Sequence, residues 1–119
     1  MRKNVSEPWF SLIALGLKKV EGRLDKGDFA DAKAGDTVTW VNSDLGFERS
    51  VKTKITAIVK YPTFQKYLKA EGLRDCLPAP GVKSVAKGVA VYKQFYADAA
   101  EREHGVLALR IKKSGTGPK

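Results

Sequence analysis

The chain has 119 residues, a length that suits one domain, and 43% of them are hydrophobic, which is enough for a packed core. One cysteine and one histidine exclude an internal disulfide and a Cys/His zinc site, so we expect no metal and no cofactor. Lysine and arginine number 22 against 13 acidic residues, and the net charge of +9 favours a polyanionic partner.

The N-terminal residues show no signal-peptide pattern. The N-terminal residues hold no long apolar segment, and no apolar run approaches the ~20 residues that cross a bilayer. We therefore expect a cytoplasmic protein without a signal peptide or a membrane partner. A single domain is expected over residues 1–113, followed by a disordered basic tail at residues 114–119, which read SGTGPK.

A first helix is predicted at Pro8, because proline suits the first helical position and the carboxylate of Glu7 suits the positive end of a helix. Apolar spacing extends this helix to Leu15, and Gly16 is a natural stop. The next residues, 18–24, alternate like a short strand whose charged side chains share one face.

Two further strands are predicted after the loop-like residues 25–36. Val38 and Trp40 alternate with polar residues in 37–42, and strict alternation continues through 49–61. The longer strand is expected to place five side chains on one face: Val51, Thr53, Ile55, Ala57 and Val59.

Two helices and a final strand complete the chain. The first helix begins at Pro62, the second runs from Ser84 to Ala97, and the strand covers residues 104–113. The buried stripe of the first helix comprises Phe64, Tyr67 and Leu68. Strands at both ends with helices between them, and no βαβ alternation, predict an α+β fold with a small, strongly curved sheet or barrel.

The charged residues after the first helix form the pattern G-x-K-x-x-E-x-R, at Gly16, Lys18, Glu21 and Arg23. Four further segments keep a characteristic order around it: PWFSLIALG, AKAGDTVTWV, LPAPGVKSVAKGVAVYKQFY and EHGVLALRI. Together, over about residues 5–112, these segments resemble the ASCH domain, a family related to the PUA fold.

The resemblance implies a PUA-like small β-barrel with flanking helices, in which the motif lines a cleft that binds RNA, a nucleoside or a nucleotide. Lys18 and Arg23 would hold a phosphate or a base edge there, and Glu21 would accept a hydrogen bond from an exocyclic amine. The ordinary alternative is a structural ion pair at the surface, worth ~0–1 kcal/mol.

A hydrolase is the alternative function. One branch of small ASCH proteins resembles amidohydrolases that remove the acetyl group from N4-acetylcytidine. The resemblance matches Lys18 and Arg23 to that branch and Glu71 to its later glutamate, but Glu21 stands where that branch has a nucleophilic threonine. Glu21 would then act as general base on a water, with Lys18 stabilising the oxyanion. Whether the chain is such an enzyme, acting on an acylated cytidine or as a ribonuclease, stays open, as does a third class, a protein-interaction module.

Several residues outside the motif are candidates for nucleic-acid contacts. Trp9, and with less support Trp40, could stack on a base. Lys52 and Lys54 share one strand face and could follow a phosphate backbone, while Lys83 precedes a predicted helix N-terminus, where amide groups attract anions. The ordinary alternatives are core tryptophans and a solvated lysine face.

Overall fold

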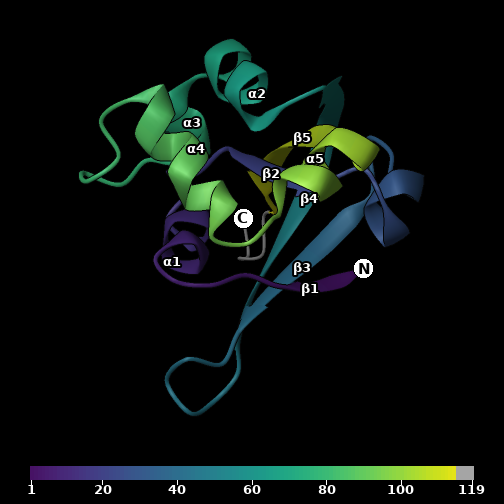
Figure 1. The fold of residues 1–119 in the computed structure, drawn as a ribbon. Coiled ribbons are helices and arrows are strands. Elements are labelled where there is room, and N and C mark those ends of the chain that lie inside the picture. The colour runs from purple at the N-terminus through teal and green to yellow at the C-terminus, as the bar shows by residue number, and fades with distance from the viewer. Residues whose placement is uncertain (115–119) are drawn as a thin grey trace.

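The computed structural model describes residues 1–114, which form one five-stranded sheet with helices on both faces (Figure 1). The elements are β1 (Arg2–Asn4), α1 (Trp9–Ala14), β2 (Val20–Leu24), the 3-10 helix η1 (Gly27–Asp31), β3 (Thr37–Asn42), β4 (Arg49–Tyr61), α2 (Phe64–Glu71), α3 (Leu73–Cys76), α4 (Val85–Lys93), α5 (Asp98–His104) and β5 (Val106–Lys113). The tail expected at 114–119 lies, apart from Ser114, outside the described residues. None of the helices in 1–114 has the length and apolar character needed to cross a bilayer.

The sheet has the order β1-β3-β4-β5-β2, in which β1 runs parallel to β3 and the other neighbours are antiparallel. The sheet curls, and its two edge strands, β1 and β2, approach each other without pairing along their backbones. A side chain spans this seam: Nη2 of Arg23 in β2 donates to the carbonyl of Asn4 in β1 at 3.0 Å. The expected α+β class and the single, nearly closed sheet are therefore confirmed.

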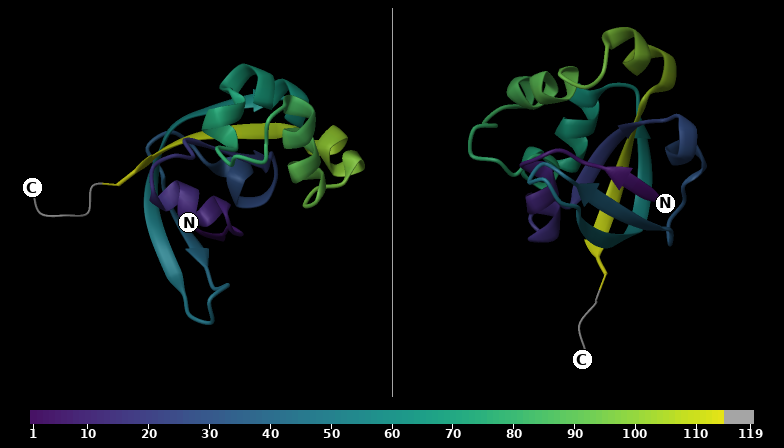
Figure 2. Two further views of the ribbon diagram at one scale, coloured as in Figure 1. Left: turned by 90° about the vertical axis from the view of Figure 1, so that its left-hand side faces the viewer. Right: turned by 90° about the horizontal axis from the view of Figure 1, so that it is seen from below.

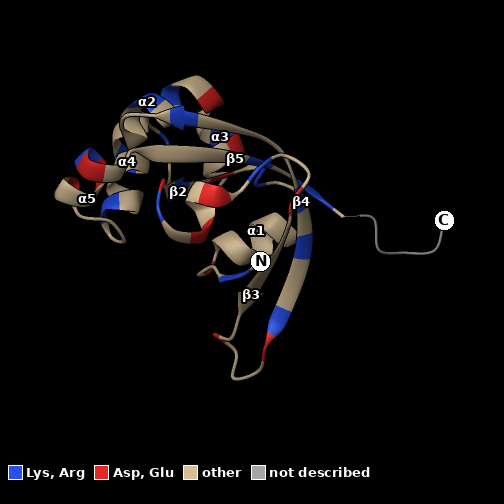
Figure 3. Cartoon of the chain, turned by 90° about the vertical axis from the view of Figure 1, so that its right-hand side faces the viewer, with Lys and Arg blue, Asp and Glu red and all other residues tan. Residues whose placement is uncertain are grey.

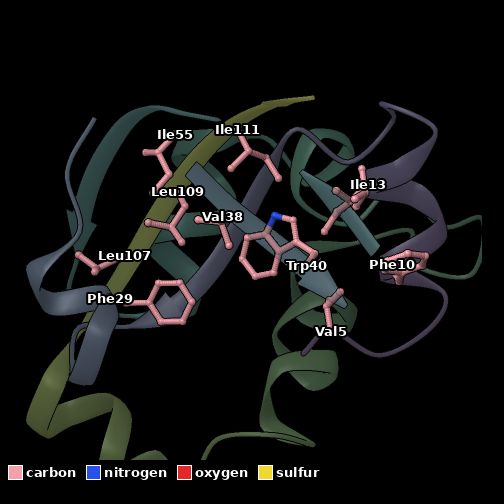
Figure 4. Close-up of a cluster of buried hydrophobic side chains, with 11 residues drawn as sticks. Val5, Phe10, Ile13, Phe29, Val38, Trp40, Ile55, Leu107, Leu109 and Ile111 are labelled. Atoms are coloured by element: carbon pink, nitrogen blue, oxygen red, sulfur yellow. The ribbon is translucent and has the colours of Figure 1, made fainter. Parts of the chain in front are cut away.

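The inner face of the curled sheet holds one hydrophobic core (Figure 4). Phe10 and Ile13 of α1 and Phe29 of η1 cover the apolar side chains of the strands. Trp40 lies at the centre with no exposed surface, and its indole Nε1 donates to the Thr53 hydroxyl at 2.9 Å. Trp40 is therefore a core residue, because no ligand in solvent can reach its ring.

The outer face holds a second core, formed where α2, α3 and α4 pack on β2 and β5. Figure 2 shows these helices on one face of the sheet and α1 against the other. The predicted stripe of α2 is confirmed, because its three residues are fully buried: Phe64, Tyr67 and Leu68. The Phe64 ring stacks on Tyr92 of α4 with 4.5 Å between centroids, which ties α2 to α4.

Strand β4 follows the predicted bounds, but its faces switch at a bulge. The pairing with β5 skips Thr56, between the pairs made by Ile55 and Ala57. Beyond the bulge, Ile58 packs on the inner core and Val59 on the outer one. The prediction that Ala57 and Val59 share a face with Ile55 is therefore wrong, because simple alternation assumes an unbroken pleat.

The helix expected from Ser84 to Ala97 is shorter than predicted, and a separate helix, α5, follows it. Its start is confirmed, since the Ser84 hydroxyl accepts from the amide of Lys87 at 3.1 Å. Its end is wrong: α4 stops at Lys93, whose ammonium pairs with Asp98 of α5 at 2.5 Å and holds the turn between the helices. Similarly, α2 begins two residues after Pro62, and four elements were not predicted from the sequence: β1, η1, α3 and α5.

Candidate functional site

The turn after α1 delivers Lys18 into the protein interior. Gly16 has a φ of +77°, a left-handed conformation that L side chains rarely adopt, and it ends the helix. The amides of Leu17 and Lys18 then both donate to the carbonyl of Leu12, at 3.0 and 3.1 Å. This tight turn leaves only 2% of Lys18 exposed, directly before β2.

The ammonium of Lys18 makes three contacts, as many as it has N–H donors. It donates to the carbonyl of Val20 at 2.7 Å and to the carbonyl of Cys76, and it lies 3.1 Å from Oε1 of Glu21. Lys18 therefore fixes β2 to α3 and positions the Glu21 carboxylate, and these contacts leave it no donor for a ligand.

Glu21 and Arg23 are two residues apart in β2, so their side chains share one face of the strand, the inner one, opposite Val20 and Leu24. Oε2 of Glu21 accepts from Nε of Arg23 at 2.8 Å. Burial alone would raise the pKa of the Glu21 carboxyl, but the charges and hydrogen bonds of Lys18 and Arg23 outweigh it and hold this pKa below its usual value. Glu21 is therefore an ionised, buried hydrogen-bond acceptor. The charges of Lys18, Glu21 and Arg23 form a largely buried cluster and not the exposed ion pair that the sequence left as an alternative.

The guanidinium of Arg23 is held on two sides. It lies over the rings of Phe29 and Trp40, 5.3 and 5.2 Å from their centroids. Its bonds to Glu21 and Asn4 use Nε and one donor of Nη2, and they leave the other guanidinium donors without a hydrogen bond to residues 1–114. Arg23 can therefore offer donors to a ligand from a fixed position.

These side chains form the floor of a cavity of about 220 Å³ between α1, β2 and the turn after α4. We call it the aromatic cavity, because four aromatic residues line it: Trp9, Tyr92, Phe95 and Tyr96. Val5, Leu77 and Val91 add apolar walls. Phe95 is 54% exposed, so its ring stands at the mouth, where a flat ligand could stack on it.

Sequence reasoning missed Tyr92, Phe95 and Tyr96 as site residues, because they follow helical spacing typical of core residues. The break after Lys93 turns Phe95 and Tyr96 toward the cavity. The only available signal was the position of Phe95 beside the apolar stripe rather than in it. Tyr92 remains a core residue as well, with its hydroxyl 2.9 Å from that of Tyr67.

Glu71 is not brought to Lys18 and Glu21. Its carboxylate accepts from Nε of Arg110 at 2.8 Å and from the Tyr61 hydroxyl, and it lines a different hollow, beside Lys19. The three residues that the hydrolase alternative requires therefore do not share a cavity.

The three candidate lysines outside the motif are exposed and lie away from the aromatic cavity. Lys52 and Lys54 lie on the outer face of β4, along which basic residues recur in Figure 3, and Lys54 faces Lys112 of β5. Lys83 lies in the loop before α4. Of the candidates, the structure brings together Trp9, Lys18, Glu21 and Arg23.

Comparisons with known proteins agree with this architecture. A family model described as ASCH domain matches residues 4–114. The chain is similar to the crystal structure of the hypothetical protein PH0355, with 35% sequence identity and a TM-score of 0.82. The alignment covers 95% of this chain and 97% of that one. The solution NMR structure of PF0455 from Pyrococcus furiosus covers 94% of each chain, with 35% identity and a TM-score of 0.73. No curated protein matches the chain. The likeness confirms the expected PUA-like small barrel with flanking helices.

Proposed function

The chain belongs to the ASCH domain family, and from this premise we propose that it binds RNA or a nucleotide by holding one nucleobase in the aromatic cavity. A nucleobase is flat and carries hydrogen-bond donors beside acceptors on its edge. The cavity offers aromatic rings for its faces and, on the floor, the free lone pairs of Glu21 beside the remaining donors of Arg23. This pairing of a fixed acceptor with a fixed donor carries the proposal.

The same contacts support binding over hydrolysis. A general base works best when its pKa lies near the working pH, whereas the pKa of Glu21 is held below its usual value. Lys18 has its donors engaged by the protein and is poorly suited to hold an oxyanion. Burial raises the pKa of the Cys76 thiol to about 11, so this thiol is a poor nucleophile at neutral pH.

Replacing Phe95 with alanine should weaken binding of a mixed-sequence single-stranded RNA by about 5- to 150-fold, because stacking on an aromatic ring contributes ~1–3 kcal/mol per base. The stability of the protein should change little, since the ring is 54% exposed. The affinity can be measured by titrating a fluorescently labelled decanucleotide.

Phe47→Ala is the matched control, because Phe47 is 59% exposed in the loop between β3 and β4 and does not line the cavity. It should leave the affinity within twofold of that of the unmodified protein. Equal losses in Phe95→Ala and Phe47→Ala, or no RNA binding by the unmodified protein, would contradict the proposed function.

The affinity for RNA should be constant from about pH 8 to about pH 5 and fall only at lower pH. Glu21 must be ionised to accept from a base amine, and its pKa in the folded protein lies below the ordinary value of 4.5. A lowered pKa also means that the stability contributed by Glu21 is present above pH 4.5 and is lost as the pH falls through the folded value.

The measurement is a series of titrations at constant ionic strength, with circular dichroism at each pH to separate unfolding from loss of binding. A midpoint near pH 6 to 7 in the binding curve, with the fold intact, would show that another group controls the affinity.

A further inference from the structure

A second hollow adjoins the aromatic cavity. It has a volume of about 320 Å³, and Arg23 and Tyr96 line both spaces, so the two share a wall. Its other charged side chains are Lys3, Lys26 and Asp28. We call it the basic hollow, because three cationic side chains face one carboxylate there.

The cations of the basic hollow differ in how they are engaged. Lys3 donates to Asp28 at 2.8 Å, so these two charges offset each other. Lys26 is exposed and forms no ion pair with any residue of 1–114, and Arg23 still has guanidinium donors without a partner there. The hollow therefore presents an unpaired positive charge on Lys26 and the unused guanidinium donors of Arg23, whose charge is shared with Glu21.

The aromatic cavity itself is unsuited to an anion. Its floor carries the Glu21 carboxylate, and the donors of Lys18 are engaged by the protein. A phosphate attached to a base would lie near the Glu21 carboxylate if it stayed in this cavity, whereas the basic hollow offers it Arg23 together with Lys26, which has no ion-pair partner in residues 1–114.

We propose that the ligand is a nucleotide rather than a nucleoside, with its base in the aromatic cavity, its ribose passing Tyr96, and its phosphate in the basic hollow between Arg23 and Lys26. The inference rests on the proposed function, because it assumes that a base occupies the aromatic cavity. Arg23 is then the residue that contacts both parts of the ligand, because it lines both spaces.

Isothermal titration tests this with four probe sets: the ribonucleosides, their 5′-monophosphates, their 3′-monophosphates and the matching phosphodiester dinucleotides. For the base that binds best, at least one phosphate form should bind about tenfold more tightly than the nucleoside, a gain of about 1.4 kcal/mol. The comparison of the 5′, 3′ and diester forms identifies which phosphate the hollow accepts.

Lys26→Gln should reduce this phosphate gain to less than about threefold. The matched control is Lys66→Gln, which removes the same charge from an exposed position on α2 outside both hollows and should keep the tenfold gain. Equal affinity for nucleoside and nucleotide would overturn the phosphate inference and leave the proposed function standing. Equal loss of the phosphate gain in Lys26→Gln and Lys66→Gln would overturn the inference, because the gain would then come from the general positive charge of the protein and not from the basic hollow. Absence of binding by every probe and by RNA would overturn both proposals.

Discussion

Replacing Lys18 with methionine should lower the free energy of unfolding by about 3–5 kcal/mol, because it removes one partner of a buried ion pair and leaves the Glu21 carboxylate undercompensated. The carbonyls of Val20 and Cys76 would lose their donor as well. Small domains are stable by only about 5–15 kcal/mol, so this change would be a large fraction of the total. Urea denaturation followed by circular dichroism measures it.

The double variant Lys18→Met with Glu21→Leu separates the structural role of the pair from its role in binding. Removing both charges should recover part of the lost stability, because an apolar pair of similar volume is often as stable as the ion pair, but Nε of Arg23 then loses its acceptor. RNA binding should be lost in the double variant, since the acceptor at the cavity floor is gone. A loss below about 1 kcal/mol in Lys18→Met would mean that the pair behaves like an exposed one.

Replacing Trp40 with alanine should also cost about 3–5 kcal/mol of unfolding free energy, the usual loss for a large aromatic residue in a core. Trp40 has no exposed surface, and the change would also remove the donor to Thr53 and one of the rings beneath Arg23. Trp9 is partly buried and lines the aromatic cavity, so Trp9→Ala should cost less stability but weaken RNA binding by about 5-fold or more.

The two tryptophan variants control for each other, because both remove an indole but only one of the two lines the cavity. Urea denaturation and RNA titration are needed for each, under conditions where both variants are folded. If Trp9→Ala loses as much stability as Trp40→Ala and keeps its affinity for RNA, Trp9 is a packing residue. Trp9 would then line the cavity without contributing to binding.

The strands of this fold could be read from the sequence where the signal is local. The alternation in residues 37–42 and 49–61 gives β3 and β4 with their observed bounds, because each strand has one face in a core. The motif spacing likewise indicated that Glu21 and Arg23 share one face of a strand, with Lys18 arriving from the helix end. These are properties of neighbouring residues along one segment.

Features set by distant partners could not be predicted in this way. The bulge at Thr56 depends on the register with β5, and the break after Lys93 depends on contacts with Asp98 in the next helix. The position of Phe95 at the cavity mouth follows from that break. The sequence also could not show that the charges of Lys18 and Glu21 compensate each other in the interior.

The seam between β1 and β2 restricts how this protein can change its ligand. Arg23 spans the seam through Asn4 and also lines the aromatic cavity, so under the proposed function one side chain serves both closure of the barrel and recognition. A substitution there that alters specificity also loosens the fold, whereas Phe95 at the mouth is 54% exposed and has no such structural role. Variation in what is bound should therefore accumulate around the mouth, and engineering of a new specificity should begin with Phe95 while the charged floor is left intact.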